Sequence, residues 1–582
     1  MTTARVTSTL DRSYIVLKKL LCLIVSTGIL TGCATSLVSK ETVALAPAWD
    51  STYVAGELNG ESLYDLLIAE LAGHQQQYDV SLEKYLKQAE LTGDPGIIRR
   101  AARIAQFTEN PDALEKAARI WIQYEPASNE PQALLAGLLI HRKEFKAALP
   151  FVKKTFSTEN HQILALLNAS AGKIPPDATQ MYLEMLIQQL KISPRYADLW
   201  LTRGIFERHQ ANPEAALKSF SKAIRFNPDA EIAVLQKADL LKEMGRYNDA
   251  LKITSSWLKN NPENKQLILI KIQTLYKADK SKSATQESYK LISDFSEDDQ
   301  LHLYLALLAL DFNRLDDSKA MLQTLLKRTG DSALYFYLGL IAEQSNQPEQ
   351  AIEHYLQVNS GSNILQSYTR SIALLNGATN EQRIAGILDQ AIVDHPELGP
   401  DLVNLHADWL RSSNLTQSAI RRISEGLATY PDNLPLRYSR AMLRPPEDFS
   451  QSEEDFRFIL KKDPDNAMAL NALGYTLSLY TQRYDEAYAL LNKAIQIKPE
   501  DPAIMDSIGW VLFKLQRHEE ALNFLKKAYE IYPDAEVGSH LISVLITLNK
   551  RDKAQEIFAE ISSKFPDNPH VTTAQNVINA QK

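Results

Sequence analysis

Cysteine is the residue type whose placement says most about chemistry in this chain of 582 residues. The sequence holds two cysteines, Cys22 and Cys33, and both lie near the N-terminus. The chain after residue 33 therefore cannot form an intramolecular disulfide, and we expect no thiolate metal site or cysteine nucleophile there. Whatever these thiols do belongs to the N-terminal segment.

The segment that leads to Cys33 has the pattern of an export signal. Lys18 and Lys19 precede an apolar run over residues 20–30, which is too short to cross a bilayer as a stable helix. The run ends in Leu-Thr-Gly-Cys at residues 30–33, which resembles the bacterial lipobox. Small residues before the cysteine let a peptidase approach the chain, and the thiol is the group that is acylated before cleavage. The alternative is a buried helix that happens to carry a cysteine.

The lipobox predicts a boundary at Cys33, which we take as the lipidation site. Residues 1–32 are then a lipoprotein signal peptide, and residues 33–60 are a lipidated flexible tether with scattered Ser, Thr and Pro. A diacyl unit plus an N-acyl chain buries enough CH₂ groups for stable anchoring. In enterobacteria an Asp after the cysteine retains lipoproteins in the inner membrane, so by resemblance Ala34 favours the outer membrane. We expect a lipid-anchored, periplasm-facing protein of that membrane.

The charge of the chain argues against nucleic acid as a partner. The formal net charge is −8, and the first 32 residues carry four basic side chains against one acidic one. The remainder therefore carries about −11, since −8 minus +3 is −11. Binding to phosphate backbones needs clustered Lys and Arg, which an acidic body of this kind does not favour.

No local sequence signature of catalysis is present. The sequence lacks H-E-x-x-H, G-x-x-x-x-G-K-[ST], G-x-G-x-x-G and G-x-S-x-G, the motifs of zinc proteases, P-loops, dinucleotide sites and nucleophile elbows. The eleven histidines are scattered along the chain. We therefore expect no catalytic residue, no metal site and no cofactor, and predict that the protein is not an enzyme.

A repeat of about 34 residues organises the rest of the chain. One unit has the pattern of large and small residues, followed by a proline, that is typical of the tetratricopeptide repeat (TPR) at its usual spacings. Its residues are Trp200, Gly204, Ala216, Phe220, Ala223 and Pro228. Prolines recur in the same phase at Pro126, Pro194, Pro228, Pro262, Pro396, Pro431, Pro464, Pro499, Pro533 and Pro566. Each proline should close the second helix of a pair, because proline cannot continue a helix. Small residues such as Gly474 and Gly509 should lie where the two helices of a pair approach closely.

The phase of the prolines predicts an all-α fold, a TPR-type α-solenoid. From Pro126 to Pro566 the distance divides into 13 units of about 33.8 residues, so we expect a right-handed superhelix of about 13 or more helix pairs. The predicted parts after the tether are an N-terminal helical extension or degenerate repeats, a degenerate TPR array, a well-formed C-terminal array and a C-terminal tail: 61–125, 126–395, 396–566 and 567–582. The turn-like Pro-Pro-Glu-Asp at residues 445–448 lies within the array.

In a TPR superhelix the first helix of each pair lines the concave groove, where a partner binds. The groove positions of the last units are Asn471, Tyr475, Asp506, Trp510, Phe513, Lys514 and His540. Asn471 and Asp506 have the polar groups to hold a peptide backbone, and Trp510 and Phe513 are candidate apolar anchors. The alternative is that Tyr475 and Trp510 simply pack between helices. The Lys and Asn pattern that clamps a carboxylate in some TPR domains is not reproduced, and Asp506 would repel such a group.

Four segments resemble a family more specific than TPR proteins in general. They are Asn-Ala-Leu-Gly-Tyr-Thr-Leu at 471–477, Asp-Ser-Ile-Gly-Trp-Val-Leu at 506–512, Leu-Ile-Ala-Glu-Leu-Ala-Gly at 67–73 and Arg-Arg-Ala-Ala-Arg-Ile-Ala at 99–105. These look like the long TPR outer-membrane lipoproteins of gammaproteobacteria, whose best-known type is the lipoprotein binding partner of the carboxyl-terminal processing protease CtpA in pseudomonads. The resemblance implies a non-catalytic adaptor that binds such a periplasmic serine protease and brings it cell-wall hydrolases to degrade.

Two other classes of function stay open on the sequence alone. An assembly-factor lipoprotein, of the pilotin or outer-membrane biogenesis type, would bind other envelope proteins instead. A peptidoglycan-binding or glycan-active protein would need a wall-binding domain or paired carboxylates on a non-repeat domain, for which the repeat phase leaves no room. The partner that copurifies from membranes would separate the adaptor from the assembly factor.

Overall fold

The computed structural model describes residues 59–156, 161–375 and 377–580, and over these ranges the chain is helical. It contains 31 α-helices, α2 to α32, and within the described ranges no strand. The all-α expectation is confirmed. The predicted signal peptide, Cys33 and nearly all of the tether lie outside the described residues.

The chain divides into two compact units, with the boundary between Leu325 and Leu326 inside helix α17 (Leu315–Thr329). The helices of unit 1 before α17 are α2 (Gly60–His74), α3 (Tyr78–Thr92), α4 (Pro95–Phe107), α5 (Pro111–Tyr124), α6 (Asn129–His141), α7 (Phe145–Thr155), α8 (His161–Ser170), η1 (Ala171–Lys173), α9 (Pro176–Ile192), α10 (Ala197–His209), α11 (Pro213–Phe226), α12 (Glu231–Glu243), α13 (Tyr247–Leu258), α14 (Lys265–Lys277), α15 (Ser281–Asp294) and α16 (Asp299–Asp311).

Unit 2 continues the same alternation of helices. Its elements after α17 are α18 (Leu334–Gln344), α19 (Pro348–Tyr355), α20 (Ile364–Leu374), η2 (Ala378–Asn380), α21 (Glu381–Asp394), η3 (Pro396–Leu398), α22 (Gly399–Ser412), α23 (Thr416–Thr429), α24 (Leu434–Leu443), η4 (Pro446–Asp448), α25 (Phe449–Lys462), α26 (Ala467–Tyr480), α27 (Tyr484–Ile497), α28 (Pro502–Lys514), α29 (His518–Ile531), α30 (Ala535–Thr547), α31 (Arg551–Lys564) and α32 (Pro569–Ala580).

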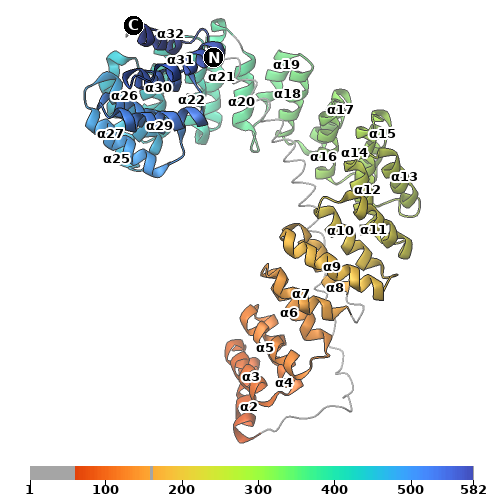
Figure 1. The fold of residues 1–582 in the computed structure, drawn as a ribbon. Helices are drawn as coiled ribbons and strands as arrows, with labels where there is room; N and C mark the ends of the chain where they lie inside the picture. Colours follow the sequence, from red (N-terminus) through yellow and green to blue (C-terminus); the bar gives the residue numbers. More distant parts are fainter. Residues whose placement is uncertain (1–58, 157–160, 376, 581–582) are drawn as a thin grey trace. The chain divides into compact units, whose positions relative to one another are not determined.

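Within each unit, neighbouring helices of the sequence pack against each other as helix A and helix B of a repeat (Figure 1). Between Pro126 and Pro566 the helices α6 to α31 follow one another as 13 successive pairs, which is the number that the proline phase predicts. Two further pairs, α2 with α3 and α4 with α5, precede them. The residues assigned to a C-terminal tail include α32, which packs mainly on α30 and buries Val571, Ala574 and Ile578. It covers the apolar end of the last pair.

All ten phased prolines follow the end of the second helix of a pair, as predicted. Nine of the ten phased prolines stand two residues beyond the end of a helix B, for example Pro228 after Phe226 and Pro499 after Ile497. Pro262 stands four residues beyond the end of α13. The predicted turn at residues 445–448 is present and contains the short helix η4.

Polar side chains start the first helix of each pair in the C-terminal repeats. Asn433, Asn466, Asp501 and Asp534 are the N-caps of α24, α26, α28 and α30, and each accepts hydrogen bonds from backbone N–H groups of the first turn. Such caps satisfy donors that the helix itself leaves unpaired. Their spacing of 33 to 35 residues fixes the register in which one repeat can be compared with the next.

The close approach of helices A and B is visible at two glycines. A Cβ atom on Gly474 would lie 2.7 Å from Leu491 Cγ, and one on Gly509 would lie 2.6 Å from Leu525 Cγ. No side chain fits at such distances unless the helices move apart. Leu491 and Leu525 are fully buried, and the absence of a side chain at Gly474 and Gly509 allows the two helices of each pair to pack closely around them.

Candidate functional site

The predicted groove residues of the last repeats lie on the first helices of three consecutive pairs. Asn471 and Tyr475 are on α26, Asp506 and Trp510 are on α28 with Phe513 and Lys514, and His540 is on α30. Helix α28 packs against both α26 and α30, so the three helices bring these side chains together. We call this set of seven residues the A-helix cluster.

A buried contact between a histidine and an aspartate lies at the centre of the A-helix cluster. His540 Nδ1 is 3.0 Å from Asp506 Oδ1 and 3.2 Å from Oδ2, and the two residues are 6% and 7% exposed. The pair joins helices α28 and α30. The Asp506 carboxylate is therefore engaged inside the protein, and it is not displayed for a peptide in the arrangement seen here.

The rings of Trp510 and Phe513 stack one after the other on the histidine of that pair. The Trp510 ring stacks on His540 with centroids 4.1 Å apart, and Phe513 stacks on Trp510 at 5.4 Å. The ammonium of Lys514 lies over the Trp510 ring at 4.7 Å, within the range of a cation–π interaction. Trp510 and Phe513 are half-buried and Lys514 is exposed, so this end of the cluster faces solvent.

Tyr475 is held in place by a residue from two repeats further on. Its hydroxyl donates to Glu536 Oε1 at 2.5 Å, and its ring centroid is 6.2 Å from that of His540. Burial raises the pKa of Tyr475 far above its usual range, and the neighbouring Glu536 carboxylate adds to that effect. Tyr475 therefore packs between helices, as the alternative interpretation of this residue expects, and it bridges α26 to α30.

Two polar atoms of the A-helix cluster have no protein partner. Asn471 Oδ1 and Trp510 Nε1 are buried without a hydrogen bond within the described part of the chain. Buried polar groups are nearly always paired, so these two atoms are an acceptor and a donor left over after folding. A peptide would reach them only after the covering side chains move.

The described residues contain neither a group of metal-binding side chains nor a membrane-spanning helix. No three His, Cys, Asp or Glu side chains in residues 59–580, outside the gaps at 157–160 and 376, gather closely enough to hold a metal ion. None of the helices that the structure describes has the length and apolar character needed to span a bilayer.

Comparison with known proteins gives the family. Three tetratricopeptide repeat models match residues 303–362, 465–534 and 512–578. The TPR repeat-containing protein PA4667 of Pseudomonas aeruginosa is 32% identical over 537 residues, which are 90% of each chain. This chain belongs to the family of TPR repeat-containing proteins.

More distant TPR proteins share less. The TPR repeat-containing protein YpiA of Bacillus subtilis is 20% identical over 295 residues, covering 49% of this chain and 68% of that protein. Among solved structures, Naa15/Naa10 bound to HypK-THB covers 90% of this chain and 96% of that chain at 12% identity, with a TM-score of 0.35. The anaphase-promoting complex heterotetramer Cut9–Hcn1 covers 84% and 97% at 15% identity, with a TM-score of 0.26. At these TM-scores the similarity says nothing about partners.

The matched TPR segments at 465–534 and 512–578 cover the whole A-helix cluster of this TPR protein. Residues 303–362 fall within the part predicted to be degenerate, and a family model still recognises them. The repeat character thus extends into the middle of the chain, where several Gly and Pro positions of the skeleton are lost.

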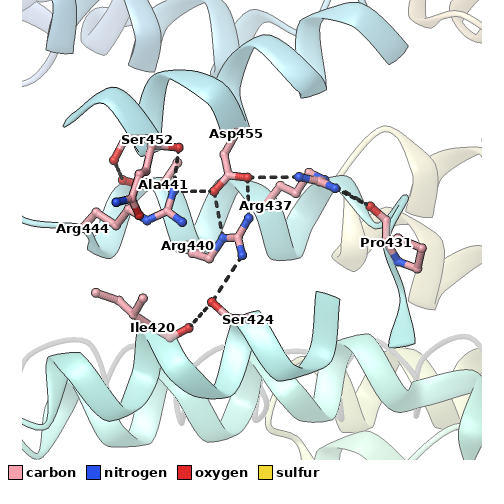
Figure 2. A network of polar contacts seen from close by, with 10 residues as sticks. Ile420, Ser424, Pro431, Arg437, Arg440, Ala441, Arg444, Ser452 and Asp455 are labelled. Atoms are coloured by element: carbon pink, nitrogen blue, oxygen red, sulfur yellow. Dashed lines mark hydrogen bonds and ion pairs between the residues drawn. The ribbon is translucent and has the colours of Figure 1, made fainter. Parts of the chain in front are cut away.

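The sequence pattern does not single out a second polar cluster of this TPR array. Three arginines of one repeat, Arg437, Arg440 and Arg444, converge on the single carboxylate of Asp455 (Figure 2). Arg440 binds it in bidentate fashion, with Nε 2.8 Å from Oδ2 and Nη2 2.7 Å from Oδ1. We call these four residues the arginine cluster.

The three arginines of the cluster occupy positions that are apolar in the next repeat. The N-caps Asn433 and Asn466 set a register shift of 33 residues, which places the three arginines opposite Leu470, Leu473 and Leu477. Those leucines are 2% exposed or less. Three basic residues at positions that are core positions in the next repeat form a sequence pattern from which this cluster could have been predicted.

Proposed function

We propose that the mature protein is a TPR scaffold, anchored in the outer membrane, that binds a periplasmic carboxyl-terminal processing serine protease. It delivers cell-wall hydrolases to that protease for degradation. A TPR fold is typical of proteins that bind other proteins, and membership of the family supports a scaffold in general. The resemblance of four segments to outer-membrane TPR lipoproteins supports the finer assignment.

The observation that carries the proposal is the surface at the solvent-facing end of the A-helix cluster. Trp510 and Phe513 form a stacked aromatic pair with Lys514 over it, and a partly exposed aromatic group with a flanking cation is typical of interface anchors. The buried His540–Asp506 pair beneath fixes the Trp510 ring by stacking, so the anchor is preorganised.

Tethering is the proposed mechanism. A scaffold that holds protease and hydrolase at once turns their encounter into an event with a high effective concentration, without any change in the chemistry of the protease. The protein then needs no catalytic group of its own, and two separate binding surfaces along the repeats are enough.

A reconstituted degradation assay tests the adaptor. With the protease and a cell-wall hydrolase, the wild-type protein should accelerate loss of the hydrolase, measured by gel densitometry over time. The double variant Phe513→Ala/Lys514→Glu should lose most of that acceleration, because it removes the exposed parts of the anchor. Lys527→Glu is the matched control, since Lys527 is exposed on α29 outside the cluster.

The outcomes of the degradation assay separate the classes of function. If the protease removes the hydrolases equally fast without the lipoprotein, the adaptor is excluded and the assembly-factor function takes its place. If Lys527→Glu impairs the reaction as much as the double variant does, the A-helix cluster is not the contact surface.

Lipidation at Cys33 is the second part of the proposal, supported by the lipobox at residues 30–33. We expect the mature chain to begin at an acylated Cys33 and to fractionate with outer membranes. Cys33→Ala should abolish acylation and leave an unprocessed precursor, or a soluble form cut elsewhere. Mass spectrometry of the mature N-terminus checks this, and an unmodified N-terminus at another residue in the wild type would contradict it.

A further inference from the structure

Unit 1 contains a large cavity that belongs neither to the A-helix cluster nor to the arginine cluster. It lies among the four helices of two successive pairs, α10 with α11 and α12 with α13, and has a volume of about 1140 Å³. Small-molecule sites usually measure roughly 300–1,000 Å³, so this cavity is at or above the upper end of that range. Its size suits a stretch of polypeptide better than a metabolite.

The lining of the cavity is strongly basic although the chain as a whole is acidic. Six basic and two acidic residues line it, namely Arg203, Lys218, Lys222, Lys237, Arg246, Lys252, Glu214 and Asp249. The net charge of these eight is +4, in a protein whose formal net charge is −8. Charge of this sign in a concave site raises the local concentration of anionic ligands.

The arginines of the lining are already neutralised. Arg246 Nη1 lies 3.7 Å from Glu214 Oε1, and Arg246 Nη2 lies 2.8 Å from Asp249 Oδ2. Arg203 Nε is 2.8 Å from Glu207 Oε1. Both acidic residues of the lining are therefore engaged by one arginine.

The four lysines of the lining are left without a carboxylate. Lys218, Lys222, Lys237 and Lys252 form no ion pair with any residue that the structure describes. They come from three helices, with two on α11 and one each on α12 and α13. The surplus charge is thus spread over the cavity and not focused on one point.

Lys237 is the most constrained of the four. It is half-buried, and its pKa is lowered by loss of solvation and by the nearby Arg246, while the Asp249 carboxylate, which is paired with Arg246, acts in the opposite direction. A desolvated ammonium that forms no direct ion pair weakens the fold, and a carboxylate that enters the cavity would give it a closer partner than Asp249. Next to it in the lining, the Trp200 ring carries the Lys222 ammonium at 3.9 Å and offers an apolar wall.

We propose that this cavity binds an acidic segment of a protein partner, with successive carboxylates paired to Lys237 and to the lysines of α11 and α13. Several separated cations in an open site of this volume match carboxylates spaced along an extended peptide. A single small oxyanion would leave most of them unpaired. The site lies wholly in unit 1 and does not depend on which protein the A-helix cluster contacts.

Fluorescence anisotropy of the full soluble chain, without its first 33 residues, tests the site. The probe is a fluorescein-labelled nonapeptide of alternating Glu and Gly, and the matched Gln–Gly peptide is its neutral control. We expect the acidic probe to bind, to weaken as salt rises, and to lose roughly tenfold or more in affinity in Lys237→Gln. The exposed pair Lys218→Gln/Lys222→Gln should weaken it as well, and these positions tolerate the change without unfolding because they face solvent.

Lys259→Gln is the control variant, since Lys259 is exposed at the end of α13 and outside the lining. Equal affinity of the acidic probe for wild type, Lys237→Gln and the Lys218→Gln/Lys222→Gln double variant would overturn the proposal. So would binding of the neutral peptide as tightly as the acidic one. Complete displacement of the probe by low millimolar inorganic phosphate would also overturn it, because it would assign the site to a small free oxyanion.

Discussion

Asp455→Ala should destabilise unit 2 by about 3–5 kcal/mol, the usual cost of removing one partner from a buried ion pair. Asp455 is 2% exposed, and its carboxylate is the shared counter-ion of three arginines whose side chains are 9% to 18% exposed. Without it, three guanidinium groups face one another in a region with little access to water. We expect the helical circular dichroism of unit 2 to be lost at a lower urea concentration than in the wild type.

The position of the arginine cluster explains why the loss should be large. On α24, Leu436 belongs to one apolar core and Ala441 to the next, so the cluster lies where two cores of unit 2 meet. Arg437 also donates to the Pro431 carbonyl, and Arg440 donates to Ser424 Oγ on the preceding helix α23 (Figure 2). The network thus ties three successive helices, and losing its anion loosens all of them.

Two further variants make this stability prediction specific. Asp465→Asn removes an exposed carboxylate that is 2.9 Å from Lys493, and it should cost at most about 1 kcal/mol. Replacing all four members of the arginine cluster by leucine, the residue that stands opposite the three arginines in the next repeat, should recover much of the loss, because a site without charges avoids the desolvation cost. If Asp455→Ala costs no more than Asp465→Asn, the cluster does not stabilise unit 2.

The sequence predicts the repeat architecture well because that architecture rests on local rules. A proline two residues after nine of the second helices, a polar N-cap before helix A in the C-terminal repeats, and a glycine where the helices touch are each visible without coordinates. The seven residues of the A-helix cluster also follow from the period, since equal positions in successive repeats come to one surface. Thus Asn471, Asp506 and His540 could be expected near one another.

The partners within each cluster could not be predicted from the period. The pairing of Asp506 with His540 and the bond from Tyr475 to Glu536 depend on side-chain rotamers and on how far one repeat is turned against the next. The arginine cluster was missed for a different reason. Its three arginines stand where the next repeat has core leucines, and a search for apolar periodicity treats such positions as lost signal, not as polar contacts.

The stability of unit 2 should fall as the pH drops from about 6.5 to about 4, and His406 should be a main cause. His406 is 5% exposed on α22, and neither ring nitrogen has a hydrogen-bond partner in the described residues. Burial and, to a smaller extent, the Arg422 charge together lower its pKa to about 4, while Asp389, which is paired with Arg422, acts weakly in the opposite direction. The folded protein therefore keeps this imidazole neutral.

The sign follows from the two protonation states. Between pH 6.5 and 4 the unfolded chain binds a proton at His406 that the folded chain does not, so acid favours unfolding. The difference of roughly 2.5 pKa units corresponds to about 3 kcal/mol, lost progressively over that window. His406→Leu fills a similar space without a titrating group, and it should flatten the dependence of the urea midpoint on pH between 7 and 4.5. His570→Gln, at a histidine whose side chain is 41% exposed, should leave the dependence unchanged. A pH slope that is the same in His406→Leu and in the wild type would show that the buried imidazole does not set the acid sensitivity of unit 2.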